Sequence, residues 1–198
     1  MSPSCRWTLA RAAGTGPARG SCGHDRLLAG ARTIEGMTAS KVYAERLIEA
    51  PLTRVWDMIA DPSQHRLFDG TGMVGELAGG TPHEVGDIFR MNMAYDNGHT
   101  LEHYQSDNLV VAYEPGRVLG WATALPDGAP LGWTWTYELT DESPRTHVRL
   151  TYDWTDTSEE SIRRFGVPLT DESGLARSLE LLDVACRGMQ QDSAATTA

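Results

Sequence analysis

The sequence predicts an α+β fold in which a curved antiparallel sheet of six or seven strands wraps around a long C-terminal helix. Three observations predict it: two short helical segments follow the first strand-like segment, a series of strand-like segments joined by short turns comes next, and one amphipathic helix closes the pattern. Strands joined by tight turns pair antiparallel. Because one helix covers a single face of such a sheet, we expect a binding cavity between the helix and the sheet.

The chain pattern begins with one strand and two short helices. Residues 41–49 alternate between two faces, as a half-buried strand does. Pro51 suits the start of a helix, and the apolar residues of 51–60 recur at three- and four-residue intervals along one helical face. Asp61-Pro62 ends this helix and caps a second helical turn, which we expect to direct Leu67 and Phe68 inward.

The middle of the chain reads as strands connected by hairpins. Asn97-Gly98, within the turn predicted at residues 95–98, is the strongest signal, because Asn-Gly favours the two-residue turn of a hairpin. The polar residues 106–108 predict a break between two strand segments. The expected segments cover residues 70–80 (strand or loop), 85–93, 99–105, 109–113, 117–123, 133–139 and 148–154.

The last part of the chain predicts a cover and a helix. Residues 155–168 are polar and irregular, and we expect a loop or short helix over the mouth of the sheet. The long helix is predicted over residues 171–187, with a stop at Gly188. Its apolar stripe contains Leu175, Leu179, Leu182 and Cys186. The small residues Ser178 and Ala185 lie in the same stripe and leave room between helix and sheet.

Composition and charge limit the classes of function. The formal net charge is −10; residues 1–40 carry a net +3, so the remainder carries −13. An acidic body repels nucleic acid, so we expect no nucleic-acid partner. No stretch approaches about 18 consecutive apolar residues, which predicts no membrane span. The three cysteines form no disulfide framework, which favours a cytoplasmic protein with reduced thiols.

The same features divide the chain into three parts. Residues 1–38 are rich in Ala, Arg, Gly and Ser without hydrophobic periodicity, which predicts a disordered N-terminal extension. Residues 39–190 form the predicted ligand-binding domain, and residues 191–198 a frayed tail. High usage of Ala, Arg and Gly favours a bacterial source.

Several short motifs add a family resemblance. They include Glu49-Ala50-Pro51, Val85-Gly86-Asp87, Tyr113-Glu114-Pro115 and Thr146-His147-Val148, in this order, before the leucine-rich last helix. In these motifs the chain resembles the START/polyketide-cyclase (SRPBCC) superfamily and its helix-grip fold, from residue 41 to about residue 188. The resemblance implies a hydrophobic cavity between sheet and last helix. It implies no particular reaction, because the superfamily includes lipid carriers, cyclases and chaperone co-activators.

Large apolar side chains on the predicted inward faces are the candidate ligand contacts. Aromatic rings and Met suit a flat hydrophobic ligand because they offer large and adaptable contact areas. Some of these residues fill the core and a subset lines the cavity. The candidates are Phe89, Met91, Met93, Trp121, Trp133, Trp135, Tyr137, Tyr152, Ser178, Leu179 and Leu182.

The sequence offers few candidates for chemistry. His103, on a strand beside Tyr104, is the candidate acid/base group. His99 and His103 share a strand face, but Glu102 alternates away from both, so we expect no metal. Gly70 to Gly75 reads GxGxxG but follows a helical turn rather than a strand, so a dinucleotide site is not predicted. We therefore expect no cofactor.

These observations predict a protein that binds a small hydrophobic molecule, polyketide-like or lipid-like. A carrier and a cyclase- or dehydratase-type enzyme both fit, and whether the chain forms a homodimer is left open. The alternative is a protein-interaction domain similar to the chaperone co-activators, with residues 155–168 and the acidic body as its contact surface.

Overall fold

The computed structural model describes residues 40–96 and 101–195. The extension predicted for residues 1–38 and the Asn97-Gly98 turn lie outside these residues. The elements are β1 Lys41–Ile48, α1 Leu52–Ala60, the 3₁₀ helix η1 Pro62–Leu67, β2 Val74–Gly79, β3 Ile88–Asp96, β4 Leu101–Glu114, β5 Val118–Ala124, β6 Pro130–Glu142, β7 Arg145–Asp153, α2 Glu159–Phe165 and α3 Glu172–Ala195.

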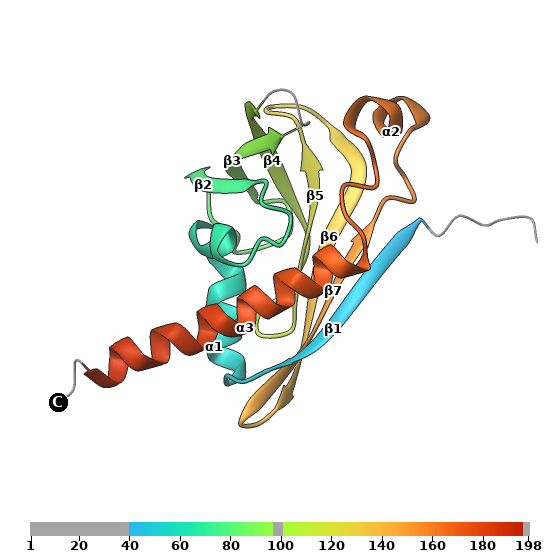
Figure 1. The fold of residues 1–198 in the computed structure, drawn as a ribbon. Coiled ribbons are helices and arrows are strands. Elements are labelled where there is room, and N and C mark those ends of the chain that lie inside the picture. Colours follow the sequence, from blue (N-terminus) through green and yellow to red (C-terminus); the bar gives the residue numbers. More distant parts are fainter. Residues whose placement is uncertain (1–39, 97–100, 196–198) are drawn as a thin grey trace, which may run out of the picture. The chain divides into compact units, whose positions relative to one another are not determined.

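The seven strands form one antiparallel sheet in the order β1-β7-β6-β5-β4-β3-β2. Figure 1 shows α3 crossing in front of β1 and β7, with α1 and η1 beside it on the same side of the sheet. Register shifts in β2, in β4 and between β5 and β6 mark bulges, which bend strands and help the sheet to curve. The predicted helix-grip architecture, with two short helices after the first strand, is confirmed.

The core lies between the inward face of the sheet and the helices. Strict alternation selects this face: in β7, Thr146, Val148, Leu150 and Tyr152 are buried, and their chain neighbours are more exposed. The same alternation on β3 and β6 matches the predicted inward residues of these strands. Leu175, Leu179, Leu182 and Cys186 form the buried stripe of α3, as the sequence predicts.

Strand β4 corrects the predicted break at residues 106–108. These polar residues are buried inside one continuous strand of 14 residues. Their hydrogen bonds explain how burial is tolerated: Arg90 Nη2 donates to Asp107 Oδ2 at 2.8 Å, and the Asp127 N–H donates to the same oxygen at 2.8 Å. A buried polar group with partners costs little, so polarity alone did not mark a chain break.

The second short helix corrects another prediction. Asp61 Oδ1 caps it by accepting from the Ser63 N–H at 3.0 Å, as expected. However, η1 is a 3₁₀ helix, in which every third residue lies on the same face. Pro62, His65 and Phe68 therefore point inward and are buried, whereas Leu67 is 44% exposed. The prediction is right for Phe68 and wrong for Leu67.

Helix α3 is longer than predicted. Asp171 caps its start, because its Oδ1 accepts from the Gly174 N–H at 3.0 Å. The helix then continues through Gly188 to Ala195, so the predicted stop at Gly188 is wrong. The tail predicted for residues 191–198 begins inside this helix, and its last three residues lie outside the described part.

One buried carboxylate joins α3 to the end of β1. Asp183 is 2% exposed. Its Oδ1 accepts from the Glu49 N–H at 3.0 Å, and its Oδ2 accepts from Arg187 Nη2 at 2.8 Å and from Arg46 Nη2 at 3.5 Å. The carboxylate thus fixes the helix against the first strand.

Within residues 40–96 and 101–195, no helix combines the length and the apolar character needed to cross a membrane.

Candidate functional site

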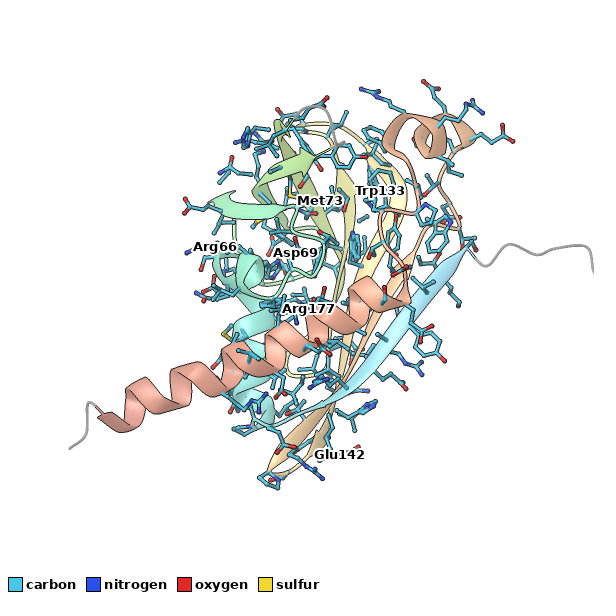
Figure 2. All side chains as sticks on the ribbon, in the orientation of Figure 1. Arg66, Asp69, Met73, Trp133, Glu142 and Arg177 are labelled. Carbon is cyan, nitrogen blue, oxygen red and sulfur yellow. The ribbon has the colours of Figure 1, made fainter. Side chains whose placement is uncertain are left out.

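A cavity of about 690 Å³ lies between the inward face of the sheet, η1 and the N-terminal part of α3. This volume is typical of small-molecule sites, which span about 300–1,000 Å³. Strands β3 to β6 supply most of its wall, and the connection from α2 to α3 borders its mouth. In Figure 2 the lining residues Asp69, Met73 and Trp133 lie above α3, whereas Glu142 lies at the opposite, lower end of the β6–β7 hairpin.

The structure brings most of the predicted ligand contacts together. Eight line the cavity: Phe89, Met91, Met93, Trp121, Trp133, Trp135, Tyr137 and Ser178. Tyr152, Leu179 and Leu182 are fully buried and do not line it. Tyr152 stacks behind Trp135 with ring centroids 4.2 Å apart. Tyr152 thus supports the wall from behind, and Leu179 and Leu182 belong to the buried core. The predicted ligand contact of these three residues is left without geometric support.

Ser178 lines the cavity for a reason other than the one predicted. Its hydroxyl accepts from the Gly70 N–H at 2.9 Å and donates to the Gly174 carbonyl oxygen at 3.2 Å. A Cβ on Gly70 would collide with the carbonyl oxygen of Gly174 and the backbone nitrogen of Ser178. Ser178 is therefore small because the backbone after η1 crosses α3 at close range. Ala185, the other small residue of the stripe, lies away from the cavity.

His103 lies at the cavity mouth with an exposed side chain. The pairing of Met93 with Tyr104 and of Ala94 with His103 puts Tyr104 on the inward face and His103 on the alternate face. This position does not favour the predicted acid/base role, which stays a prediction. Among the described residues, no three His, Cys, Asp or Glu side chains gather as metal ligands would. His99 lies outside the described residues.

His65, which the sequence analysis did not select, is a buried ionisable group of the cavity. It is 6% exposed and lies between rings: its imidazole stacks on Trp121 at 5.3 Å and meets the edge of Phe89 at 5.6 Å. Its Nε2 lies 2.8 Å from the Ile59 carbonyl oxygen. The three-residue period of η1, which aligns His65 with Pro62 and Phe68, is the signal that would have found it.

Burial lowers the pKa of His65 below its ordinary value, although the Ile59 carbonyl and the charges of Asp61 and Asp69 oppose this effect. His65 is thus neutral near pH 7. A carbonyl oxygen only accepts hydrogen bonds, so Nε2 carries the proton and Nδ1 keeps its lone pair. Nδ1 has no hydrogen-bond partner among the described residues. Protein atoms do not cover it completely, so a ligand can reach it.

A second polar feature of the wall comes from β4 and β5. Asn108 Oδ1 accepts from Thr123 Oγ1 at 3.3 Å, and Asn108 Nδ2 donates to Ser106 Oγ at 3.4 Å. All three side chains line the cavity. Ser106 and Asn108 belong to the segment predicted as a break, where continued two-residue alternation would have shown both facing inward.

Helix α2 borders the mouth, in agreement with the cover predicted for residues 155–168. Phe165 packs edge-on against Trp133 with centroids 5.6 Å apart, and Arg163 and Arg164 also border the cavity. Gly132 in β6 has φ 99°, and a Cβ there would collide with the carbonyl oxygen of Asp156. The glycine therefore lets the chain before α2 approach the sheet closely.

The buried histidine predicts a pH dependence of stability. An unfolded histidine gains its proton near pH 6.5, but folded His65 gains it only at lower pH. Between these values the unfolded state binds more protons, so His65 costs no stability above pH 6.5 and the free energy of unfolding falls as the pH drops below it. The slope from one group is at most about 1.4 kcal/mol per pH unit.

Urea unfolding at pH 7.5, 6.0 and 5.0 measures this effect. We expect the stability advantage of the wild type over His65→Gln to shrink as the pH falls, because glutamine does not titrate. The pKa values of Asp61, Asp107 and Asp171 are lowered from 3.8. These carboxylates therefore change the stability of both proteins only at lower pH. His147→Gln, on a half-buried strand position away from the cavity, is the matched control. Parallel pH profiles for wild type and His65→Gln would refute the assignment.

Comparisons with known proteins agree with this geometry. The family model described as Activator of Hsp90 ATPase homolog 1-like protein matches residues 49–186. The match runs from the end of β1 to Cys186 in α3 and so includes every wall of the cavity. No curated protein matches the chain.

Solved structures share the fold. A protein from Nitrosomonas europaea has 13% identity and a TM-score of 0.54, with 76% of this chain and 96% of that chain covered. The Zhui aromatase/cyclase from Streptomyces sp. R1128 has 14% identity and a TM-score of 0.50, covering 74% and 93%. A norcoclaurine synthase point mutant from Thalictrum flavum, solved with a transition-state analogue, has 13% identity and a TM-score of 0.51, covering 76% and 95%. At such identities the likeness shows the fold alone.

Proposed function

Because the chain belongs to the family of Activator of Hsp90 ATPase homolog 1-like proteins, within the START/polyketide-cyclase superfamily, we propose that it binds a small hydrophobic molecule, polyketide-like or lipid-like, between the sheet and α3. One observation carries the proposal: a cavity of about 690 Å³ whose wall is mostly apolar and includes several aromatic and methionine side chains. Such a wall gains free energy when it replaces water by an apolar ligand.

Between the two roles that fit such a cavity, we favour a cyclase- or dehydratase-type enzyme over a carrier. A carrier needs only an apolar wall. This wall also holds the neutral imidazole of His65 and the phenol of Tyr137, whose pKa is raised by burial. Cyclisation or dehydration of a polyketide needs a proton donor or acceptor beside an enolisable carbonyl, and these groups can supply both. His103, exposed at the mouth, is the weaker candidate for this role.

The experiment begins with the full chain purified from its expression host. Native mass spectrometry detects any bound small molecule, and extraction followed by fragmentation identifies it. The same protein is then incubated with linear poly-β-ketone analogues and with long-chain fatty acids, and the recovered compounds are compared with those from buffer alone. Thermal unfolding measures whether each compound stabilises the protein, as a ligand of the native state must.

Each outcome decides one part of the proposal. Recovery of a cyclised or dehydrated product, absent from the buffer control, supports the enzyme. A stabilising ligand that is recovered unchanged overturns the enzymatic role and supports a carrier. If no compound binds or stabilises the protein, ligand binding itself is refuted.

The alternative role is that of a protein-interaction domain similar to chaperone co-activators. The description of the matching family, which names an activator of the Hsp90 ATPase, is the observation in its favour. The exposed residues of α2 and the acidic surface would then form the contact. Stimulation of the ATPase of an Hsp90-type chaperone by a protein that binds no ligand would support this role instead.

A further inference from the structure

The inner wall of the cavity contains a stack of three rings. The imidazole of His65 and the phenol of Tyr137 each stack on the indole of Trp121, with centroids 5.3 and 6.0 Å from it. Phe68 contacts both outer rings, at 5.4 Å from His65 and 6.3 Å from Tyr137. All four side chains line the cavity. The stack therefore presents two polar ring edges with the edge of the indole between them.

The two polar edges have opposite hydrogen-bonding character. Nδ1 of His65 is an acceptor, because Nε2 already donates to the Ile59 carbonyl oxygen. The phenol of Tyr137 stays protonated and offers its O–H as a donor. Within residues 40–96 and 101–195 this O–H has no hydrogen-bond partner, and protein atoms do not cover it completely. Desolvated groups of this kind favour ligands that complete their hydrogen bonds.

Three other polar side chains of the wall, Asp69, Asn108 and Ser178, are already engaged. The carboxylate of Asp69 accepts from the Thr71 N–H at 2.9 Å, from Thr71 Oγ1 at 2.7 Å and from the Val74 N–H at 2.8 Å. Asn108 bonds Ser106 and Thr123, and Ser178 bonds the backbone of Gly70 and Gly174. In the ring stack, His65 Nδ1 thus offers a neutral acceptor and the Tyr137 O–H a neutral donor. The indole N–H groups of Trp121 and Trp135 also line the cavity without a partner among the described residues.

From these contacts we propose that the cavity selects flat hydroxy-ketones: compounds that donate a phenol or enol hydroxyl to His65 Nδ1 and accept from the Tyr137 O–H through a carbonyl oxygen, with their apolar body against Trp121. This inference rests on the proposed function, because it names the substrate class of the same cavity. A ligand with neither group would leave both ring edges without partners, which weakens its binding.

Three naphthalene probes of matched shape test the proposal on the full chain. 6-Hydroxy-2-acetonaphthone carries both groups, 2-acetonaphthone lacks the hydroxyl and 2-naphthol lacks the ketone. Isothermal titration calorimetry gives their dissociation constants for the wild type and the variants. We expect the first probe to bind about tenfold more tightly than either of the others, which is the effect of one net hydrogen bond in a desolvated site.

Variants assign each preference to one residue. Tyr137→Phe removes the donor and keeps the ring, so it should abolish the preference for the ketone but keep the preference for the hydroxyl. His65→Phe should do the reverse. Tyr113→Phe is the matched control, since Tyr113 packs on Trp56 at 5.6 Å and does not line the cavity. The wild-type comparison of the three probes stands even if His65→Phe does not fold.

The outcomes separate this inference from the proposed function. Equal binding of the three probes by the wild type overturns the hydroxy-ketone assignment but leaves an apolar ligand cavity intact. A preference that survives in both variants overturns the roles of His65 and Tyr137. Failure of all three probes to bind counts against ligand binding itself, and the inference fails with it.

Discussion

Met93→Trp is expected to weaken the binding of any cavity ligand by at least about a hundredfold, equivalent to about 2.7 kcal/mol. Met93 lies on the inward face of β3, between buried Met91 and exposed Tyr95, so its side chain stands on the route from the mouth to the inner wall. A rigid indole there occupies space that a ligand needs. Because Met93 is half-buried beside an open cavity, we expect little cost to folding.

The measurement is a titration with 6-hydroxy-2-acetonaphthone, together with urea unfolding of each variant. Val111→Trp adds the same indole to β4 at a position that is 43% exposed and away from the cavity, and we expect wild-type binding for it. If Met93→Trp folds as the wild type does and binds equally well, the ligand does not enter the cavity described here.

Asp183→Ala is expected to lower the free energy of unfolding by about 3 kcal/mol. The substitution leaves the Glu49 N–H without its acceptor and removes the shared partner of Arg46 and Arg187. Both arginines are partly exposed, at 39% and 51%, and water compensates part of their loss, which keeps the effect at the lower end of the range for buried ion pairs. Urea unfolding at pH 7.5 measures the difference.

Glu180→Ala is the matched control one turn earlier on α3. Its partner Arg177 lies 3.1 Å away, and the two side chains are 49% and 59% exposed. Exposed pairs of this kind contribute about 0–1 kcal/mol, so we expect a change within about 0.5 kcal/mol. Equal effects of the two substitutions would show that Asp183 does not anchor the helix to β1.

The fold could be predicted because local patterns and tertiary structure agree along most of the chain. In β6, Trp133, Trp135 and Tyr137 alternate with Thr134 and Thr136, and the sheet preserves that alternation against both neighbouring strands. The buried stripe of α3 likewise follows directly from its spacing. Where one face of an element is buried, a shift of one residue would expose the whole apolar set, so register follows from sequence.

The site was harder to predict, because its polar members depend on distant partners. His65 is buried through a contact with the Ile59 carbonyl and through rings from β3 and β5, which no local pattern reveals. Asp107 looks like a loop residue until Arg90 and the Asp127 N–H are placed around it. An inward orientation also does not tell whether a side chain lines the cavity or packs behind its wall. Tyr152 and Trp135 both point inward, but Trp135 lines the cavity and Tyr152 stacks behind it.

The order of the sheet has a consequence for folding kinetics. Among the described strands, the first, β1, pairs only with the last, β7, so Lys41 lies opposite Asp153 and Ile48 opposite Thr146. The Arg149–Glu45 contact closes a separation of 104 positions in the chain. Closing so long a loop is entropically costly before other contacts form, and folds of high contact order fold slowly. During synthesis β1 therefore leaves the ribosome long before its partner, and its unpaired edge is a site where the nascent chain is open to aggregation and to chaperones.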